Sequence, residues 1–238
     1  MTKTIQLGEI EVIVTHKAIK NVHLSVYPPS GRVKIAAPEH MSLETIRIFA
    51  VAKLDWIKRQ QAKLRAQARE QPREFLTRES HYLWGQRYLL KVIEGEQKHR
   101  VELKGKQLML YVRSGTSSEK CQEIIQSWYR AQLRAELPDL IAKWESRLGV
   151  NVAVFHLQRM KTKWGSCNPS KSSIRLNTDL AKKPRECLEY IVLHEVAHLL
   201  ERTHNVRFVA LMDKHMPHWP QYRKILNTLP VAHEDWGF

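Results

Sequence analysis

Three histidines and one glutamate lie close together in the stretch HEVAHLLERTH, which runs from His194 to His204. Positions four apart on a helix share a face, so His194 and His198 could offer imidazole nitrogens to one metal ion. Glu195 stands beside them as a carboxylate that could take a proton from a water molecule at the metal. This pattern is typical of zinc-dependent hydrolases in which the glutamate is the general base.

A catalytic zinc ion usually has three protein ligands and one open position, so a third ligand is needed. We expect it to be His204. A continuous helix would turn this residue away from the first two histidines, so the helix should end between Leu199 and Thr203, with Thr203 or Asn205 capping a new helix. Glu201, which stands where the elongated HExxHxxGxxH motif has glycine, is the alternative third ligand. The alternative hypothesis without a metal is that the three histidines are unconnected residues of a buried helix.

Apolar periodicity predicts the elements that position these side chains. Helical spacing predicts helices over residues 42–70, 118–148 and 184–200, the second with a kink at Pro138 and an end at Gly149. Alternating patterns predict a small antiparallel sheet within residues 10–38 and further strands within 82–113 and 152–177. No internal repeat is apparent in the sequence.

Composition indicates a folded protein of a reducing compartment. The chain has 238 residues, 43% of them hydrophobic, which is enough for a substantial core. The sequence shows no uninterrupted apolar run of membrane-spanning length and no secretory signal, so we expect a cytoplasmic protein without a membrane anchor. Cys121, Cys167 and Cys187 are far apart in the sequence and are expected to be free thiols.

The chain is strongly basic, with 39 Lys and Arg residues against 24 Asp and Glu, a formal net charge of +15. Eight of the basic residues lie between Arg159 and Arg185, where Asp179 is the one acidic residue, and another eight lie between Lys53 and Arg78. Such a balance favours acidic partners, so nucleic acid or nucleotides could bind this surface. A solvated helix face is the simpler explanation for the second stretch.

Several stretches resemble the YgjP-like and SprT-like zinc metallopeptidase families. They are MKTKWGSCN, IRLNTDL and YIVLHEVAHLLERTHNVRF, with VHLSV, VKIAAP, LDWIKRQ and YLWGQRYLLKV further upstream. The resemblance implies that His194, His198 and His204 hold one Zn²⁺ ion per chain and that Glu195 is the general base. The resemblance leaves the substrate open, and a protein or peptide is the substrate we expect.

The strand that carries WGSC could bind that substrate along its edge. Trp164, Gly165 and Ser166 are the candidate contacts, because glycine allows close approach of another backbone. Packing in the core is the alternative for Trp164, and a buried, inert thiol is the expectation for Cys167. Tyr190, one helical turn before His194, could donate a hydrogen bond in the site or simply pack.

Together these observations predict an α+β protein. Residues 1–115 should form an N-terminal unit with an antiparallel sheet and a long helix, which could recognise substrate. Residues 116–238 should form a zincin-like hydrolase domain. We expect a zinc-dependent metalloendopeptidase that could act on nucleic-acid-associated proteins. The alternatives are a metal-dependent nucleoside triphosphate hydrolase and a nucleic-acid-binding module with a structural metal.

Overall fold

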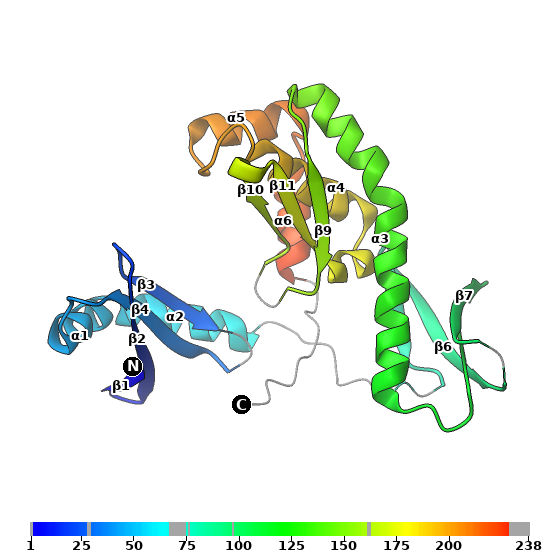
Figure 1. Ribbon diagram of the computed structural model, residues 1–238, viewed down its shortest axis with the longest axis horizontal. Helices are drawn as coiled ribbons and strands as arrows, with labels where there is room; N and C mark the ends of the chain where they lie inside the picture. Colours follow the sequence, from blue (N-terminus) through cyan, green and yellow to red (C-terminus); the bar gives the residue numbers. More distant parts are fainter. Residues whose placement is uncertain are drawn as a thin grey trace. The chain divides into compact units, whose positions relative to one another are not determined.

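The computed structural model describes residues 2–27, 30–66, 75, 77–96, 98–160 and 163–228 (Figure 1). The fold is a mixture of helices and sheets, as predicted. The chain divides into two compact units near residue 70, and the second extends to residue 229. This division differs from the expected boundary near residue 115. None of the described helices is both long and apolar enough to cross a membrane.

The first unit is a four-stranded sheet followed by two helices. Its strands are β1 (Thr2–Leu7), β2 (Ile10–Lys17), β3 (His23–Tyr27) and β4 (Arg32–Pro38), in the order β1-β2-β4-β3. The β1–β2 and β3–β4 pairs are antiparallel, but β2 and β4 run parallel, so the prediction of a fully antiparallel sheet is wrong. The reason is that β4 lies between β2 and β3 instead of at the edge.

Two helices replace the single one predicted over residues 42–70. They are α1 (Leu43–Ala52), which begins at the N-cap Ser42, and α2 (Leu54–Ala66). Lys53 interrupts them with φ −103° and ψ 6°. Residues 67–70 lie outside the described part of the chain. Ile46 and Ile57 are fully buried and pack these helices on the sheet together with Val12, Val33 and Ile35.

The second unit starts with the same topology. Strands β5 (Ser80–Leu83), β6 (Gln86–Glu94), β7 (Arg100–Lys104) and β8 (Gln107–Val112) are ordered β5-β6-β8-β7, again with the two central strands parallel and the outer pairs antiparallel. Helix α3 (Ser118–Leu148) follows and contains Pro138 in its interior. It ends, as predicted, at Gly149, whose φ of 67° is left-handed. The structure thus contains a repeat of strand topology that the sequence did not reveal.

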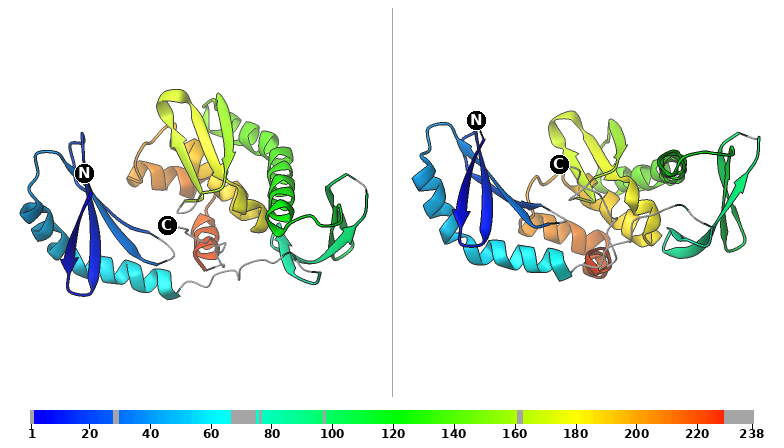
Figure 2. Two further views of the ribbon diagram at one scale, coloured as in Figure 1. Left: turned by 60° about the horizontal axis from the view of Figure 1, so that its bottom comes forward. Right: turned by 90° about the horizontal axis from the view of Figure 1, so that it is seen from below.

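A three-stranded sheet and three helices complete the second unit. Strands β9 (Val154–Gln158), β10 (Gly165–Asn168) and β11 (Ser173–Asn177) have the order β10-β11-β9, so β10 is an edge strand. The short helices η1 (Pro169–Lys171) and η2 (Thr178–Lys182) flank β11. Helix α4 (Arg185–Ala197) contacts β10, β11, α3, α5 (Val206–His215) and α6 (Trp219–Thr228), and lies among these elements in Figure 2.

Contacts between β5–β8 and the rest of the second unit explain why the units divide near residue 70. The backbone N–H of Trp84 donates to the carbonyl of Ala181 over 2.8 Å, and the hydroxyl of Tyr129 in α3 donates to the carbonyl of Tyr82 over 2.8 Å. Leu110 of β8 shares one buried core with residues of α3, β11 and α4. The sheet β5–β8 therefore packs with the elements that carry the histidines.

Candidate functional site

Helix α4 ends where the histidine motif requires it to end. Its residues from Cys187 to Ala197 are mostly buried, which fixes the helix in the core. His194 lies in the last turn, and His198 is the C-cap residue with φ −67° and ψ −13°. The N–H groups of Leu199 and Leu200 then donate to the carbonyls of Val196 and Ala197, both over 3.0 Å. These tighter bonds end the helix at Ala197, so the predicted break exists but begins just before the expected range of Leu199 to Thr203.

The turn that follows brings His204 back toward α4. Asn205 caps α5, because its Oδ1 accepts a hydrogen bond from the N–H of Phe208 over 2.9 Å. Its Nδ2 donates to Oε2 of Glu201 over 3.0 Å. Of the two predicted caps, Asn205 is therefore the one used. Glu201, the alternative third ligand, holds the cap residue in place and is not part of the histidine cluster.

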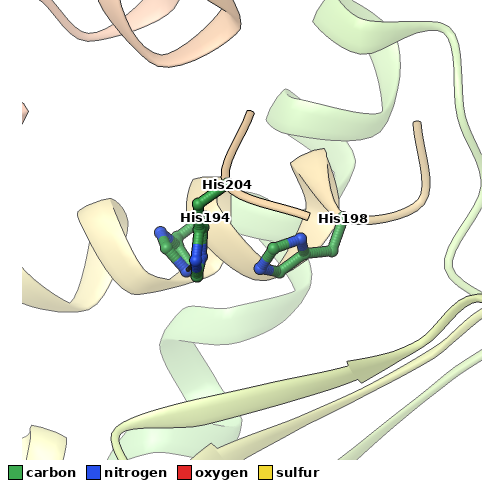
Figure 3. A group of neighbouring side chains, drawn as sticks. All are labelled: His194, His198 and His204. Atoms are coloured by element: carbon green, nitrogen blue, oxygen red, sulfur yellow. Dashed lines mark hydrogen bonds between the residues drawn. The ribbon is translucent and has the colours of Figure 1, made fainter. Parts of the chain in front are cut away.

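The three imidazole rings converge on one point, as Figure 3 shows. Nε2 of His194 and Nε2 of His204 are 3.0 Å apart, and one nitrogen from each ring lies within 4.8 Å of the others. Nδ1 of His198 lies 2.9 Å from the carbonyl oxygen of Glu201, which orients that ring. Among the described residues, this is the one cluster of His, Cys, Asp or Glu side chains that could hold a metal ion.

The histidine cluster suits a small cation that prefers nitrogen ligands. Burial, with His198 and His204 nearby, lowers the pKa of His194 to about 3, and burial also lowers the pKa of His204. Both rings are therefore neutral at pH 7, which is the form that binds metal. Nitrogens of two tetrahedral zinc ligands lie about 3.3 Å apart, given Zn–N distances of about 2.0–2.1 Å. The separation between His194 and His204 is close to that value.

Glu195 points from α4 toward the edge strand β10. Its side chain is 5% exposed, and this burial raises the pKa of its carboxyl group to about 8, although Lys163 opposes the rise. A Cβ atom at Gly165 would lie 2.5 Å from Oε1 and 2.8 Å from Cδ of Glu195. Gly165 is therefore close to the carboxylate itself, and no side chain fits between strand and helix at this point.

The other candidate residues lie in β10 or directly before it. Trp164 is partly buried, with Nζ of Lys183 5.6 Å from the centroid of its ring, and its carbonyl accepts a hydrogen bond from Asn177. Ser166 is also partly buried. Burial, with Glu195 nearby, raises the pKa of Cys167 to about 11, so its thiol is protonated at neutral pH. Contact of Trp164, Gly165 and Ser166 with a substrate stays a prediction.

Phe208 belongs to the site, although its place in the sequence indicated only a residue of the second helix. Its ring is 3% exposed and lies 4.9, 4.7 and 4.8 Å from the ring centroids of His194, His198 and His204. Its place as an apolar residue in the first turn of the helix that follows His204 was the signal that could have identified it. Phe208 thus forms an apolar wall that keeps the three imidazoles together.

A second aromatic contact leads from the site to α6. Tyr190 is buried, its ring meets His194 edge-on at 5.8 Å and stacks on Trp219 at 6.1 Å. The guanidinium of Arg223 lies 6.0 Å from the Trp219 ring and is one cause of the lowered pKa of His194. This packing places a positive charge from α6 near the histidines.

Much of the positive charge between Arg159 and Arg185 is engaged within the protein. Lys182 and Arg159 pair with Asp179 at 2.7 and 3.9 Å, and Arg185 pairs with Glu136. Lys183 is buried. These contacts explain part of the basic stretch as internal structure. All three cysteines are free, as expected.

Comparison with known proteins extends these findings. The family described as YgjP-like, metallopeptidase domain, matches residues 20–229. A comparison with curated protein sequences finds no match. Two similar solved structures are the metallopeptidase zymogens jannalysin of Methanocaldococcus jannaschii and abylysin of Pyrococcus abyssi, each 21% identical, with TM-scores of 0.35 and 0.36. They cover 38% and 40% of this chain, and 93% and 98% of their own chains are matched.

Proposed function

The chain belongs to the YgjP-like metallopeptidase family, and on this basis we propose that it hydrolyses peptide bonds with one zinc ion held by His194, His198 and His204. The observation that carries the proposal is the convergence of three imidazoles, of His194, His198 and His204, beside a buried carboxylate. When bound, a zinc ion in such a site activates a water molecule and polarises the carbonyl group of the substrate.

Glu195 is the general base in this proposal. One of its Oε atoms accepts the proton of the attacking water and then passes it to the nitrogen that leaves. Burial in a poorly solvated position supports this role, because it raises the affinity of the carboxylate for a proton. Gly165 supports it as well, since the missing side chain leaves space for the carboxylate beside the edge strand.

The substrate backbone lies along β10 in this proposal. An edge strand has free N–H and C=O groups on one side and can pair with an extended peptide. Because β10 contacts α4, a peptide on this edge would run close to Glu195 and the histidines. Trp164 and Ser166 would flank the bound peptide.

Glu195→Gln tests the proposal when the purified protein is loaded with zinc. We expect about one zinc ion per chain in both proteins, and hydrolysis of a mixed peptide substrate by the wild type only. Glu186→Gln, an exposed position in the first turn of the same helix, is the matched control and should retain full activity. Activity retained by Glu195→Gln would remove this residue as the base. Hydrolysis of nucleoside triphosphates in place of peptides, dependent on His194, would support the phosphohydrolase alternative instead.

A further inference from the structure

The first unit contains a groove between the β1–β2 hairpin and one face of helices α1 and α2. Its volume is about 700 Å³. Leu7, Ile10, Val51 and Leu54 form an apolar floor, and Val51 is 53% exposed. Three cations, Arg47, Lys58 and Arg65, line the groove, and Glu9 is its one acidic lining residue. None of the three cations is in an ion pair within the described part of the chain.

The topological repeat identifies the counterpart of this groove in the second unit. Buried positions of β4 and the following helix match those of β8 and α3 at constant spacing: Val33 with Leu108, Ile35 with Leu110, Ile46 with Cys121, and Ala50 with Ile125. The N-caps Ser42 and Ser117 also match. By the same spacing Leu54, in the groove, corresponds to Tyr129. The hairpin tip at Gly8 and Glu9 corresponds by topology to the tip at Trp84 and Gly85, because each joins the first two strands of its sheet.

The second unit fills its counterpart groove with its own residues 178–184. Trp84 at the hairpin tip donates a hydrogen bond to Ala181, and a Cβ at Gly85 would lie 3.1 Å from Pro184. Nζ of Lys182 lies 5.7 Å from the centroid of the Tyr129 ring. Leu180 and Ala181 are fully buried in this position. In the second unit, a short turn centred on Leu180 and Ala181 therefore covers the hairpin tip and the helix. The hairpin tip of the first unit is not covered in this way, because a Cβ atom at Gly8 would meet nothing within 4 Å.

We propose that the groove of the first unit is a docking site for a short acidic segment of a partner protein. Apolar side chains of the segment pack on Leu7, Val51 and Leu54, as Leu180 and Ala181 pack in the second unit. Its carboxylates pair with Arg47, Lys58 and Arg65. Charge complementarity favours an acidic ligand, and the apolar floor favours a peptide. No aromatic side chain lines the groove, so it lacks the stacking surface that single-stranded nucleic acids use.

The test is binding of labelled peptides to the full chain, measured by fluorescence anisotropy. The probes are an acidic peptide built around a leucine–alanine pair and its counterpart with amides in place of carboxylates. Arg47→Glu/Lys58→Glu reverses two charges inside the groove. Lys53→Glu/Arg59→Glu reverses two exposed charges on the same helical segment outside it and is the matched control. All four positions are exposed, and thermal unfolding of each variant verifies that it is folded.

We expect the acidic peptide to bind the wild type and the control variant alike, and to lose about tenfold or more in affinity with the groove variant or on amide replacement. Equal binding to both variants would overturn the proposal. Because the partner sequence is unknown, a displayed library of random peptides provides a second measurement. Acidic sequences should be enriched by the wild type and not by the groove variant. Equal enrichment by both, or tighter binding of a single-stranded oligonucleotide through the same cations, would refute a peptide site.

Discussion

The α-carbon of Gly165 on β10 faces the carboxylate of Glu195 on α4 so closely that a methyl group on residue 165 would lie 2.5 Å from Oε1. This contact joins the edge strand to the helix that carries the histidines. It means that the position of the carboxylate depends on the absence of a side chain on the neighbouring strand. Gly165 is therefore a positioning residue in the proposed mechanism.

Gly165→Ala should displace the Glu195 carboxylate and lower kcat/KM by about 10²-fold, because a shift of about 1 Å in a catalytic group has an effect of this size. Gly165 is not a member of the histidine cluster, so the zinc content should not change. Ser173→Ala, on the neighbouring strand β11, is the control and should remain active. Full activity of Gly165→Ala, measured with equal zinc content, would show that the contact does not position the base.

Lys163→Gln should move the acidic limb of the pH profile of kcat/KM to higher pH. The positive charge of Lys163 lowers the pKa of Glu195, which burial raises to about 8. Since a general base works only when ionised, loss of this charge requires a higher pH for the same activity, by about half a pH unit or more. Lys171→Gln, an exposed position on η1, should leave the profile in place. An unchanged profile for Lys163→Gln would show that the acidic limb does not report the ionisation of Glu195.

Asn205→Ala should destabilise the second unit by about 1 kcal/mol, because Asn205 is the N-cap of α5. The same change should weaken zinc binding, since His204 immediately precedes the cap and Asn205 also holds Glu201. Thr203→Ala is the matched control, with an expected change below about 0.5 kcal/mol because Thr203 is exposed. Chemical unfolding and zinc titration measure the two effects. Equal losses of stability and zinc affinity in Asn205→Ala and Thr203→Ala would contradict the role of Asn205 as the N-cap.

Asp179→Asn should lower the free energy of unfolding at pH 7 by about 1–3 kcal/mol. Burial opposes ionisation of Asp179, but Lys182, Arg159 and Lys183 outweigh it and lower the pKa of its carboxyl group. Because the folded pKa lies below the unfolded value of about 3.9, the stabilisation is present above that pH and is lost as the pH falls through the folded pKa. The difference between the two proteins should therefore vanish in acid. A difference that persists there would point to lost packing.

Local spacing in the sequence predicted the centre of the site. The four-residue step from His194 to His198, and the need to bring His204 to the same ion, required the helix break that the structure shows. Helix α3 and its end at Gly149 also followed from local signals, namely apolar periodicity and a glycine that can take a left-handed conformation.

Contacts between distant residues could not be predicted in this way. The parallel pairing of β2 with β4 depends on which strand lies in the middle of the sheet, and no local pattern of the strands determines that. The same applies to the contact between Gly165 and Glu195, which joins two elements whose packing is tertiary. The repeat of β1–β4 and α1 in β5–β8 and α3 was hidden because buried positions such as Ile46 and Cys121 share only their burial.

Zinc titration of the wild type beside His204→Gln tests the proposed metal site most directly. We expect about one tightly bound ion per wild-type chain and a loss of affinity of about 10²-fold or more in the variant, because one of three ligands is removed. His215→Gln, on α5 outside the cluster, should bind zinc as the wild type does. No zinc bound by the wild type, or equal affinity in the wild type and His204→Gln, would contradict a zinc site built from the three histidines.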